Sequence, residues 1–145
     1  MASLVLKMSV SLDGYVAPAD GSSGWEAAGR SPDGAEWVLD TVGKASAHLV
    51  GAATYARWAS FWPGAAGPFA APMNEIPKVV FSNSLASADW GEATIETGLI
   101  DEYRLVVHPV ILGAGEHLFT SPLTINPVST AAFSGGAVAH VFTAH

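Results

Sequence analysis

Hydrophobic and polar residues alternate loosely from Leu4 to Leu12, and a period of two is typical of a half-buried strand. Asp13 and Gly14 follow as a turn signal, after which an apolar run resumes at Tyr15. Similar apolar runs predict strands over 47–51, 78–85 and 101–113, the last interrupted by Pro109, and a hairpin of two strands around Ser134-Gly135-Gly136 within 125–145.

Two other stretches have the pattern of helices. Ser31 is a plausible N-cap with Pro32 at the first helical position, which predicts a helix over 31–46. A second helix is predicted over 52–62, directly after Gly51, while 17–34 and 64–77 have the composition of loops. Helices and strands alternate early and strands dominate late. We therefore expect one α/β domain over residues 1–145, with a mostly parallel central sheet and a C-terminal antiparallel hairpin.

Composition limits the classes of function. Half of the residues are hydrophobic and 13% are charged, which is enough apolar surface for a substantial core. The net charge of −7 argues against nucleic-acid binding, because a phosphate backbone would be repelled. The chain has no cysteine, and its five histidines lack the spacing of a metal site, so no metal is expected. With neither a charged signal-peptide start nor an apolar run of about 18 residues, we expect a soluble, cytoplasmic protein without membrane contact.

Several residues are candidates for a site, each with a structural alternative. Asp13 is either a turn residue bonded to its own backbone or a carboxylate held at the edge of a pocket. Gly51 and Thr54 lie where a strand enters a helix, which is either a ligand site or an ordinary connection. Trp25, Phe61 and Trp62 either form a wall for a flat ligand or pack beneath loops.

Four motifs together resemble one family. They are "MSVSLDGYVA", "HLVGAATYARW", "IPKVVFSNSL" and "GLIDEYRLVVHPVILGAGEHLF", in this order along nearly the whole chain. They are similar to the RibD C-terminal domain, the reductase domain of bifunctional riboflavin-biosynthesis proteins, and to its stand-alone relatives. The resemblance implies the three-layer dihydrofolate reductase-like fold, a homodimer, and hydride transfer from NADPH to a small heterocyclic or sugar-derived substrate.

The resemblance also implies roles for individual residues. Asp13 would face the substrate and act as the catalytic carboxylate, which favours the pocket interpretation over the turn alone. The cofactor would contact Ala17, Gly51, Thr54, Ser82, Asn83 and Ser84. The substrate would contact Leu112, Gly113 and Gly115, together with the candidate walls Trp25 and Trp62.

Two departures weaken the expected preference for NADPH. The family usually has a basic residue after the glycine of the second motif, where this chain has Ala52 and Ala53. The third motif often carries an Arg or Thr beside its serine, where this chain has Asn83 between two serines. Without a bidentate phosphate clamp, hydroxyls and backbone amides discriminate less between the two cofactors, so NADH is a possible alternative.

A third departure concerns the junction between Ile95 and Glu96. The resemblance implies a helix, a strand ending in a Gly-Gly turn that holds the cofactor pyrophosphate, and another helix at this point, on the order of thirty residues. A central strand cannot be lost from such a sheet without exposing its neighbours. We therefore predict that Ile95 and Glu96 are not consecutive in the complete protein. If they are, the chain is shortened and lacks the pyrophosphate site.

Two hypotheses follow. The first is an NAD(P)H-dependent reductase of the dihydrofolate reductase-like superfamily, similar to 5-amino-6-(5-phosphoribosylamino)uracil reductase. The second is a catalytically silent homologue that binds a nucleotide or another small ligand. Both predict a homodimer, because the long apolar strands from Glu102 onward would otherwise present an exposed sheet edge.

Overall fold

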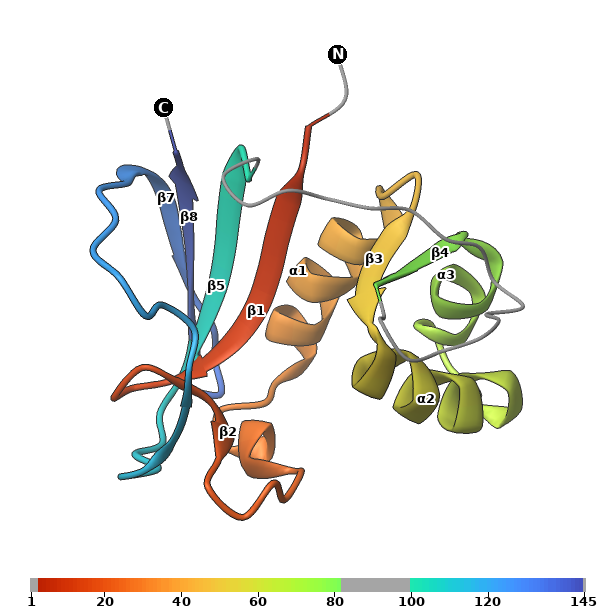
Figure 1. Ribbon diagram of the computed structural model, residues 1–145, viewed down its shortest axis with the longest axis horizontal. Coiled ribbons are helices and arrows are strands. Elements are labelled where there is room, and N and C mark those ends of the chain that lie inside the picture. Colours follow the sequence, from red (N-terminus) through yellow and green to blue (C-terminus); the bar gives the residue numbers. More distant parts are fainter. Residues whose placement is uncertain (1–2, 82–99, 145) are drawn as a thin grey trace. The chain divides into compact units, whose positions relative to one another are not determined.

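The computed structural model describes residues 3–81 and 100–144 of the chain (Figure 1). The chain divides into two compact units, one formed by Met1–Glu36 and Gly98–His145 and the other by Trp37–Thr97. Three of the predicted cofactor residues, Ser82, Asn83 and Ser84, lie outside the described residues, as does the junction between Ile95 and Glu96.

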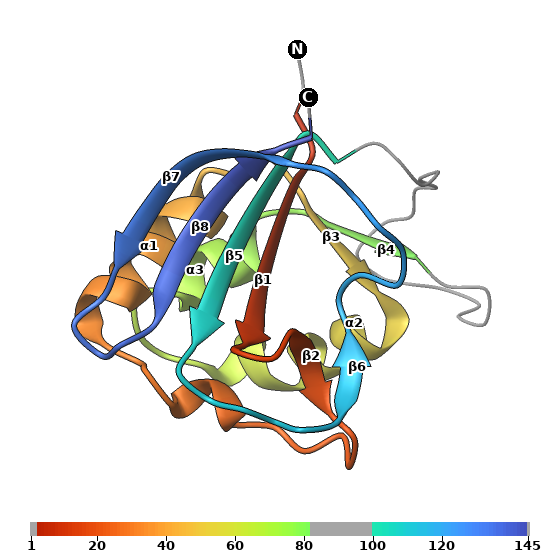
Figure 2. The same cartoon turned by 90° about the vertical axis from the view of Figure 1, so that its left-hand side faces the viewer.

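The first unit contains a four-stranded mixed sheet (Figure 2). Its strand order is β1 (Val5–Ser11), β5 (Glu102–His108), β8 (Val138–Thr143) and β7 (Asn126–Ala132). β1 runs parallel to β5, whereas β5–β8 and β7–β8 are antiparallel pairs. The α/β class and the C-terminal hairpin expected from the sequence are therefore confirmed.

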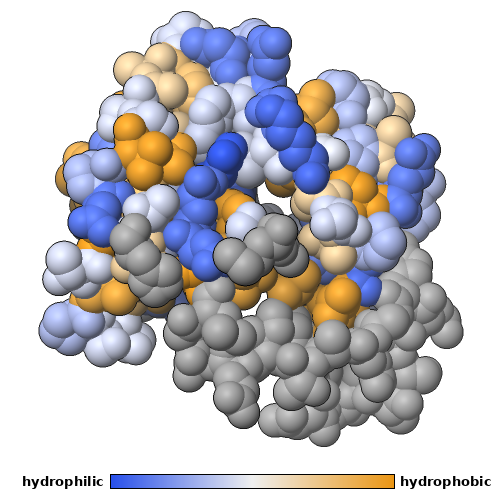
Figure 3. Space-filling view, turned by 90° about the horizontal axis from the view of Figure 1, so that it is seen from above, coloured by the Kyte–Doolittle hydropathy of each residue, from blue (hydrophilic) through white to orange (hydrophobic). Residues whose placement is uncertain are grey.

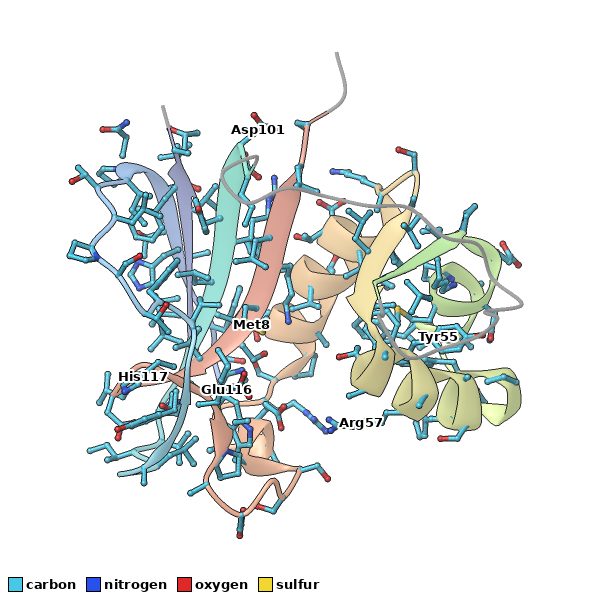
Figure 4. The ribbon with its side chains drawn as sticks, in the orientation of Figure 1. Met8, Tyr55, Arg57, Asp101, Glu116 and His117 are labelled. Carbon is cyan, nitrogen blue, oxygen red and sulfur yellow. The ribbon has the colours of Figure 1, made fainter. Side chains whose placement is uncertain are left out.

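The alternation along β1 separates two faces of this sheet. Val10 packs with Tyr103 and Leu105 in the hydrophobic core, and Met8, midway along β1, adjoins this cluster (Figure 4). The alternate residues of β1 lie on the opposite face, because successive side chains of a strand point to opposite sides. The buried residues at that face's strand positions are Ser11, Val106, His108, Ala139 and Val141.

A short antiparallel ribbon joins β2 (Tyr15–Pro18) to β6 (Gly115–His117). The Tyr15 and His117 rings lie in contact with their centroids 4.4 Å apart and their planes tilted by 31°. Gly115 is required here, since its φ is +150° and an added Cβ would lie 2.0 Å from the Ala17 carbonyl oxygen. Part of the predicted loop over 17–34 is thus ordered structure, which also includes a 3-10 helix, η1 (Trp25–Ala27).

Helix α1 (Pro32–Gly43) begins in the first unit with Pro32 as its first residue, as predicted, and ends three residues before the expected boundary at 46. Asp33 ties this start to the β7–β8 turn. Its carboxylate accepts bonds from the backbone N–H of Ser134 (2.8 Å) and from the Ser134 hydroxyl (2.8 Å). The helix start is therefore fixed to the sheet by one side chain.

The second unit is built around a parallel pair of strands, β3 (His48–Gly51) and β4 (Lys78–Phe81). Helix α2 (Ala52–Phe61) follows β3 directly and continues into η2 (Trp62–Gly64). The loop predicted over 64–77 contains a further helix, α3 (Ala70–Glu75), with Pro72 in its first turn. That prediction was wrong because proline is tolerated in a first turn, where the N–H groups have no partner within the helix.

Proline acts differently at the end of β5. The strand predicted over 101–113 stops at His108, because Pro109 has no N–H to continue the ladder and the Val110 N–H bonds back to the His108 carbonyl (2.8 Å). The chain then enters the β5–β6 loop, defined here as residues 109–114.

On the surface seen from above, hydrophobic residues are interspersed with hydrophilic ones (Figure 3). Within the described residues, every helix falls short of the length and hydropathy that a membrane crossing needs.

Candidate functional site

Polar side chains gather at the carboxyl ends of the parallel strands β1 and β5. Ser11 and His108 are register partners at these ends, and their exposed fractions are 1% and 7%. Ligands of open α/β sheets bind beyond the carboxyl ends of parallel strands, where loops leave the sheet. This edge of the first unit is therefore the place to look for a site.

Asp13 lies just beyond the end of β1 and bonds to two loops. Its Oδ1 accepts from the Ser11 hydroxyl (2.7 Å) and from the backbone N–H of Leu112 (3.1 Å). Its Oδ2 accepts from the backbone N–H of Gly113 (2.8 Å). The Ser11 hydroxyl in turn accepts from the Tyr15 N–H (2.9 Å). Asp13 is thus more than a turn residue, because it connects the β1–β2 turn to the β5–β6 loop.

These bonds favour the ionised carboxylate of Asp13. The Ser11 hydroxyl lowers the pKa most, and the N–H groups of Gly113 and Leu112 add to its effect, giving a pKa of about 2 against the usual 3.8. Hydrogen bonds to a carboxylate stabilise its charged form. At neutral pH the group is therefore an anionic acceptor.

Lys7 is a candidate that the sequence reasoning missed. It lies on β1 with Ser9 and Ser11 at alternate positions, and its ammonium donates to the Ser9 hydroxyl (3.3 Å). Burial lowers the pKa of Lys7, while the charge of Glu26 partly opposes this shift. No carboxylate of the described residues lies within ion-pair distance of Lys7. The signal in the sequence was the polar alternation of Lys7, Ser9 and Ser11 in an otherwise apolar strand.

His108 shows a second feature that spacing did not reveal. Its Nδ1 lies 2.9 Å from the Ala28 carbonyl oxygen, and because a carbonyl only accepts, Nδ1 carries the hydrogen. Its Nε2 is buried without a hydrogen-bond partner among the described residues. The Trp25 ring meets the imidazole edge-on at 5.6 Å. Trp25, expected to form a ligand wall, thus packs on His108.

The structure brings most of the first-unit candidates together. Leu112 and Gly113 bond to Asp13, and Gly115 lies against Ala17, which pairs with Glu116 across the ribbon. Glu116 and His117 are labelled on β6 in Figure 4. The motifs around Asp13 and around Gly113 are far apart in sequence but form one hydrogen-bonded assembly.

In the second unit, the β3–α2 connection places Gly51 and Thr54 at a helix start. Gly51 is the N-cap residue with φ −77° and ψ 166°, and no side chain caps α2. Among the described residues, an added Cβ at Gly51 would meet nothing within 4 Å. The first N–H groups of a helix have no partner within it, and they attract anions. Thr54 is exposed in this first turn.

Two further residues on α2 and η2 complete the candidates of this unit. Arg57, labelled in Figure 4, is exposed one turn after Thr54 on the same side of the helix. Trp62 packs edge-on against Phe61, with ring centroids 4.9 Å apart, and its carbonyl accepts from the Asn74 amide (2.8 Å). Phe61 remains 61% exposed.

Comparisons with known proteins agree with this fold. Residues 2–93 match the RibD C-terminal domain family, a match that ends just before the Ile95–Glu96 junction. Over 51 residues the chain is 43% identical to the uncharacterized protein YyaP of Bacillus subtilis. This match covers 33% of this chain and 27% of that protein. The match therefore spans about a quarter of that relative.

Two solved structures share the architecture. A proposed riboflavin biosynthesis protein of Shewanella sp. PV-4 aligns with a TM-score of 0.73 and 18% identity, covering 98% of both chains. A diaminohydroxyphosphoribosylaminopyrimidine deaminase/5-amino-6-(5-phosphoribosylamino)uracil reductase of Thermotoga maritima aligns with a TM-score of 0.65 and 16% identity, over 97% of this chain and 56% of that one. The fold is thus that of the dihydrofolate reductase-like reductases, and the chain belongs to the RibD C-terminal domain family.

Proposed function

We propose that this protein is an NAD(P)H-dependent reductase that transfers hydride to a small heterocyclic or sugar-derived substrate. The observation that carries the proposal is the row of polar side chains leading to the carboxyl ends of β1 and β5 in a member of a reductase-domain family. Lys7, Ser9 and Ser11 occupy positions that an all-apolar face would fill at lower cost, because a partly buried ammonium is penalised unless a ligand or partner compensates it.

For the cofactor, the start of α2 fits a phosphate group. No side chain of the described residues caps it or lies within 4 Å of a Cβ added at Gly51, which leaves room for an anion to approach the backbone N–H groups. Thr54 adds a hydroxyl, and Arg57 offers the cation that Ala52 and Ala53 do not. The remaining proposed contacts are Ala17 and the residues Ser82, Asn83 and Ser84, which lie outside the described residues.

For the substrate, the first unit offers the partly buried ammonium of Lys7 and an ordered loop. Lys7 would bind a carbonyl or phosphate oxygen, and Leu112, Gly113 and Gly115 would border the substrate beside Asp13. NADPH, when bound, supplies the hydride. The chain's own residues would orient the substrate and neutralise charge that develops on its oxygen or nitrogen.

The substrate class follows the neighbouring structures. Because the Thermotoga maritima protein is named as a 5-amino-6-(5-phosphoribosylamino)uracil reductase, we propose this pyrimidine or a relative of it as the first substrate to test. A phosphorylated, electron-poor heterocycle also suits a site that includes the partly buried ammonium of Lys7.

The proposal is tested by calorimetric titration with NADPH, NADH and FMN, followed by turnover of NADPH with the pyrimidine above. We expect saturable NADPH binding and turnover. Lys7→Met should reduce turnover at least tenfold without loss of stability, because it removes a partly buried charge. Lys44→Met is the matched control, since Lys44 is an exposed lysine just after the end of α1 that pairs with Asp40 of that helix. Equal activity of both variants would contradict the role of Lys7.

The alternative is a silent ligand-binding homologue, favoured by Ala52 and Ala53 at the usual basic positions. NADPH binding without turnover of any pyrimidine or pterin would support it. Absence of binding to all three cofactors would exclude both the reductase and a nucleotide-binding role.

We also propose a homodimer formed through the late strands. In the part of the chain that the structure describes, β7 pairs with β8 on one side only, and Val128 on β7 is 58% exposed. An unpaired sheet edge of this length is a template for association. Light scattering should give twice the monomer mass, and a monomer at high concentration would count against this.

Finally, we propose that the complete protein contains a segment between Ile95 and Glu96. Intact mass spectrometry of the protein from its native source decides this. A mass equal to that of the 145-residue sequence would refute the segment and, with it, the Gly-Gly pyrophosphate site.

A further inference from the structure

The bonds of Asp13 are directed at the backbone of a distant loop. Two consecutive N–H groups, those of Leu112 and Gly113, donate to its two different oxygens. Leu112 is 99 residues away in sequence, so this is a tertiary contact and not part of a local turn. Since a carboxylate accepts along about four lone-pair directions, three are already in use with the Ser11 bond.

The β5–β6 loop is also fixed at both of its ends. At its beginning, the Leu12 N–H donates to the Val110 carbonyl (2.8 Å). At its end, Gly115 lies so close to Ala17 that no side chain would fit. Asp13 supplies the acceptors for the middle of the loop, where Gly113 adopts a left-handed conformation with φ +76°.

A second carboxylate in the same unit makes a comparable contact away from the strand ends of the site. Asp33 accepts from the backbone N–H and the hydroxyl of Ser134, and thereby ties α1 to the β7–β8 turn. Both carboxylates are exposed, and hydrogen bonds lower the pKa of both. Asp33 is therefore a matched internal control for the effect of removing such a contact.

We propose that Asp13 is a positioning residue whose carboxylate holds Leu112 and Gly113 in place beside the substrate, instead of exchanging a proton with it. The inference rests on the proposed function, because it assigns a role within that site. A carboxylate that accepts three hydrogen bonds is a poor base, and its low pKa leaves no proton to donate at neutral pH. Its contribution to the reaction therefore passes through the loop.

The test combines hydrogen exchange with kinetics on the full chain. Asp13→Asn should speed amide exchange of Leu112 and Gly113 by about tenfold or more, because the charged acceptor is lost. With NADPH and 5-amino-6-(5-phosphoribosylamino)uracil as probes, it should raise KM while the pH profile of kcat keeps its shape. Asp33→Asn should speed exchange at Ser134 and at Gly34, whose N–H groups donate to the Asp33 carboxylate, and leave exchange at Leu112 and Gly113 and the kinetics unchanged.

Two results would overturn the inference. One is unchanged exchange at Leu112 and Gly113 in Asp13→Asn. The other is the loss of one limb of the pH profile of kcat in Asp13→Asn, which is the signature of proton transfer by Asp13. If Asp13→Asn does not fold, Asp13→Glu serves, since a displaced carboxylate would still exchange protons but would not fit the loop. Wild-type protein that neither turns over nor binds the probes refutes the proposed function and this inference with it, whereas unchanged exchange refutes this inference alone.

Discussion

The ends of β1 and β3 differ in whether a side chain supplies a hydrogen-bond acceptor for the backbone N–H groups nearby. At the end of β1, Asp13 and Ser11 accept hydrogen bonds from the N–H group of Tyr15 in the following turn and from those of Leu112 and Gly113 in the β5–β6 loop. At the end of β3, Gly51 starts α2 with no side chain capping the helix.

The difference indicates which end is available to an external anion. A carboxylate of the chain already occupies the anion position at the end of β1, so a ligand there meets a negatively charged, ordered loop. At the start of α2 the first-turn N–H groups remain, and no described residue lies within 4 Å of a Cβ added at Gly51. This supports our proposal that the phosphate of a cofactor binds at α2.

We call the end of β1, where Asp13 occupies the anion position, the closed end, and the start of α2 the open end. The closed end, with the ribbon that adjoins it, should tolerate substitution far less than the open end. Gly115→Ala places a Cβ 2.0 Å from the Ala17 carbonyl oxygen at φ +150°, and we expect it to reduce the free energy of unfolding by about 3 kcal/mol. Gly51→Ala is the control, because φ is −77° and the added Cβ would meet nothing among the described residues, so the change should stay within about 1 kcal/mol, the cost of replacing an acceptable N-cap residue by a poor one. Urea denaturation measures both, and similar losses would contradict the comparison.

The open end should matter for ligand affinity and not for stability. Thr54→Val removes an exposed hydroxyl in the first turn of α2, and we expect NADPH to bind about tenfold more weakly, the effect of one hydrogen bond to a charged group. Ser60→Ala, on the same helix but bonded to the Arg57 carbonyl, should leave the affinity unchanged. Calorimetry compares the two variants, and equal affinities would remove Thr54 from the proposed cofactor site.

Acid should weaken the hydrogen bonds at the end of β1, because it protonates the Asp13 carboxylate. Because the pKa of Asp13 is lowered to about 2 in the folded protein, the unfolded chain binds a proton more readily, and stability falls as pH drops. The contribution is complete above the usual pKa of 3.8 and is lost between pH 3.8 and about 2. The thermal midpoint of the wild type should therefore fall more steeply in this window than that of Asp13→Asn. Parallel curves would show that the hydrogen bonds of the Asp13 carboxylate contribute nothing to stability.

Much of this could be predicted from the sequence because local patterns determine it. The alternation from Leu4 to Leu12, the Gly-Gly hairpin and the Pro32 helix start were all confirmed. The partners of Asp13 could not be predicted without the family resemblance, since they are backbone groups about a hundred residues away and backbone groups carry no residue-specific signal. Lys7 and His108 escaped notice for a similar reason, as burial and a missing partner are properties of the folded state.

The smallest expected change in stability comes from adding an N-cap side chain at the start of α2. Gly51→Asp would give α2 the acceptor it lacks, because the extended conformation of Gly51 is the one that N-cap residues adopt. We expect a gain of only about 0.3 kcal/mol, since glycine is itself an acceptable N-cap. NADPH affinity should nevertheless fall at least tenfold, because the new carboxylate occupies the N–H groups and repels phosphate. Gly51→Ala, which adds a side chain without an acceptor, separates charge from bulk. If Gly51→Asp binds NADPH as well as the wild type does, the phosphate does not bind at the start of α2.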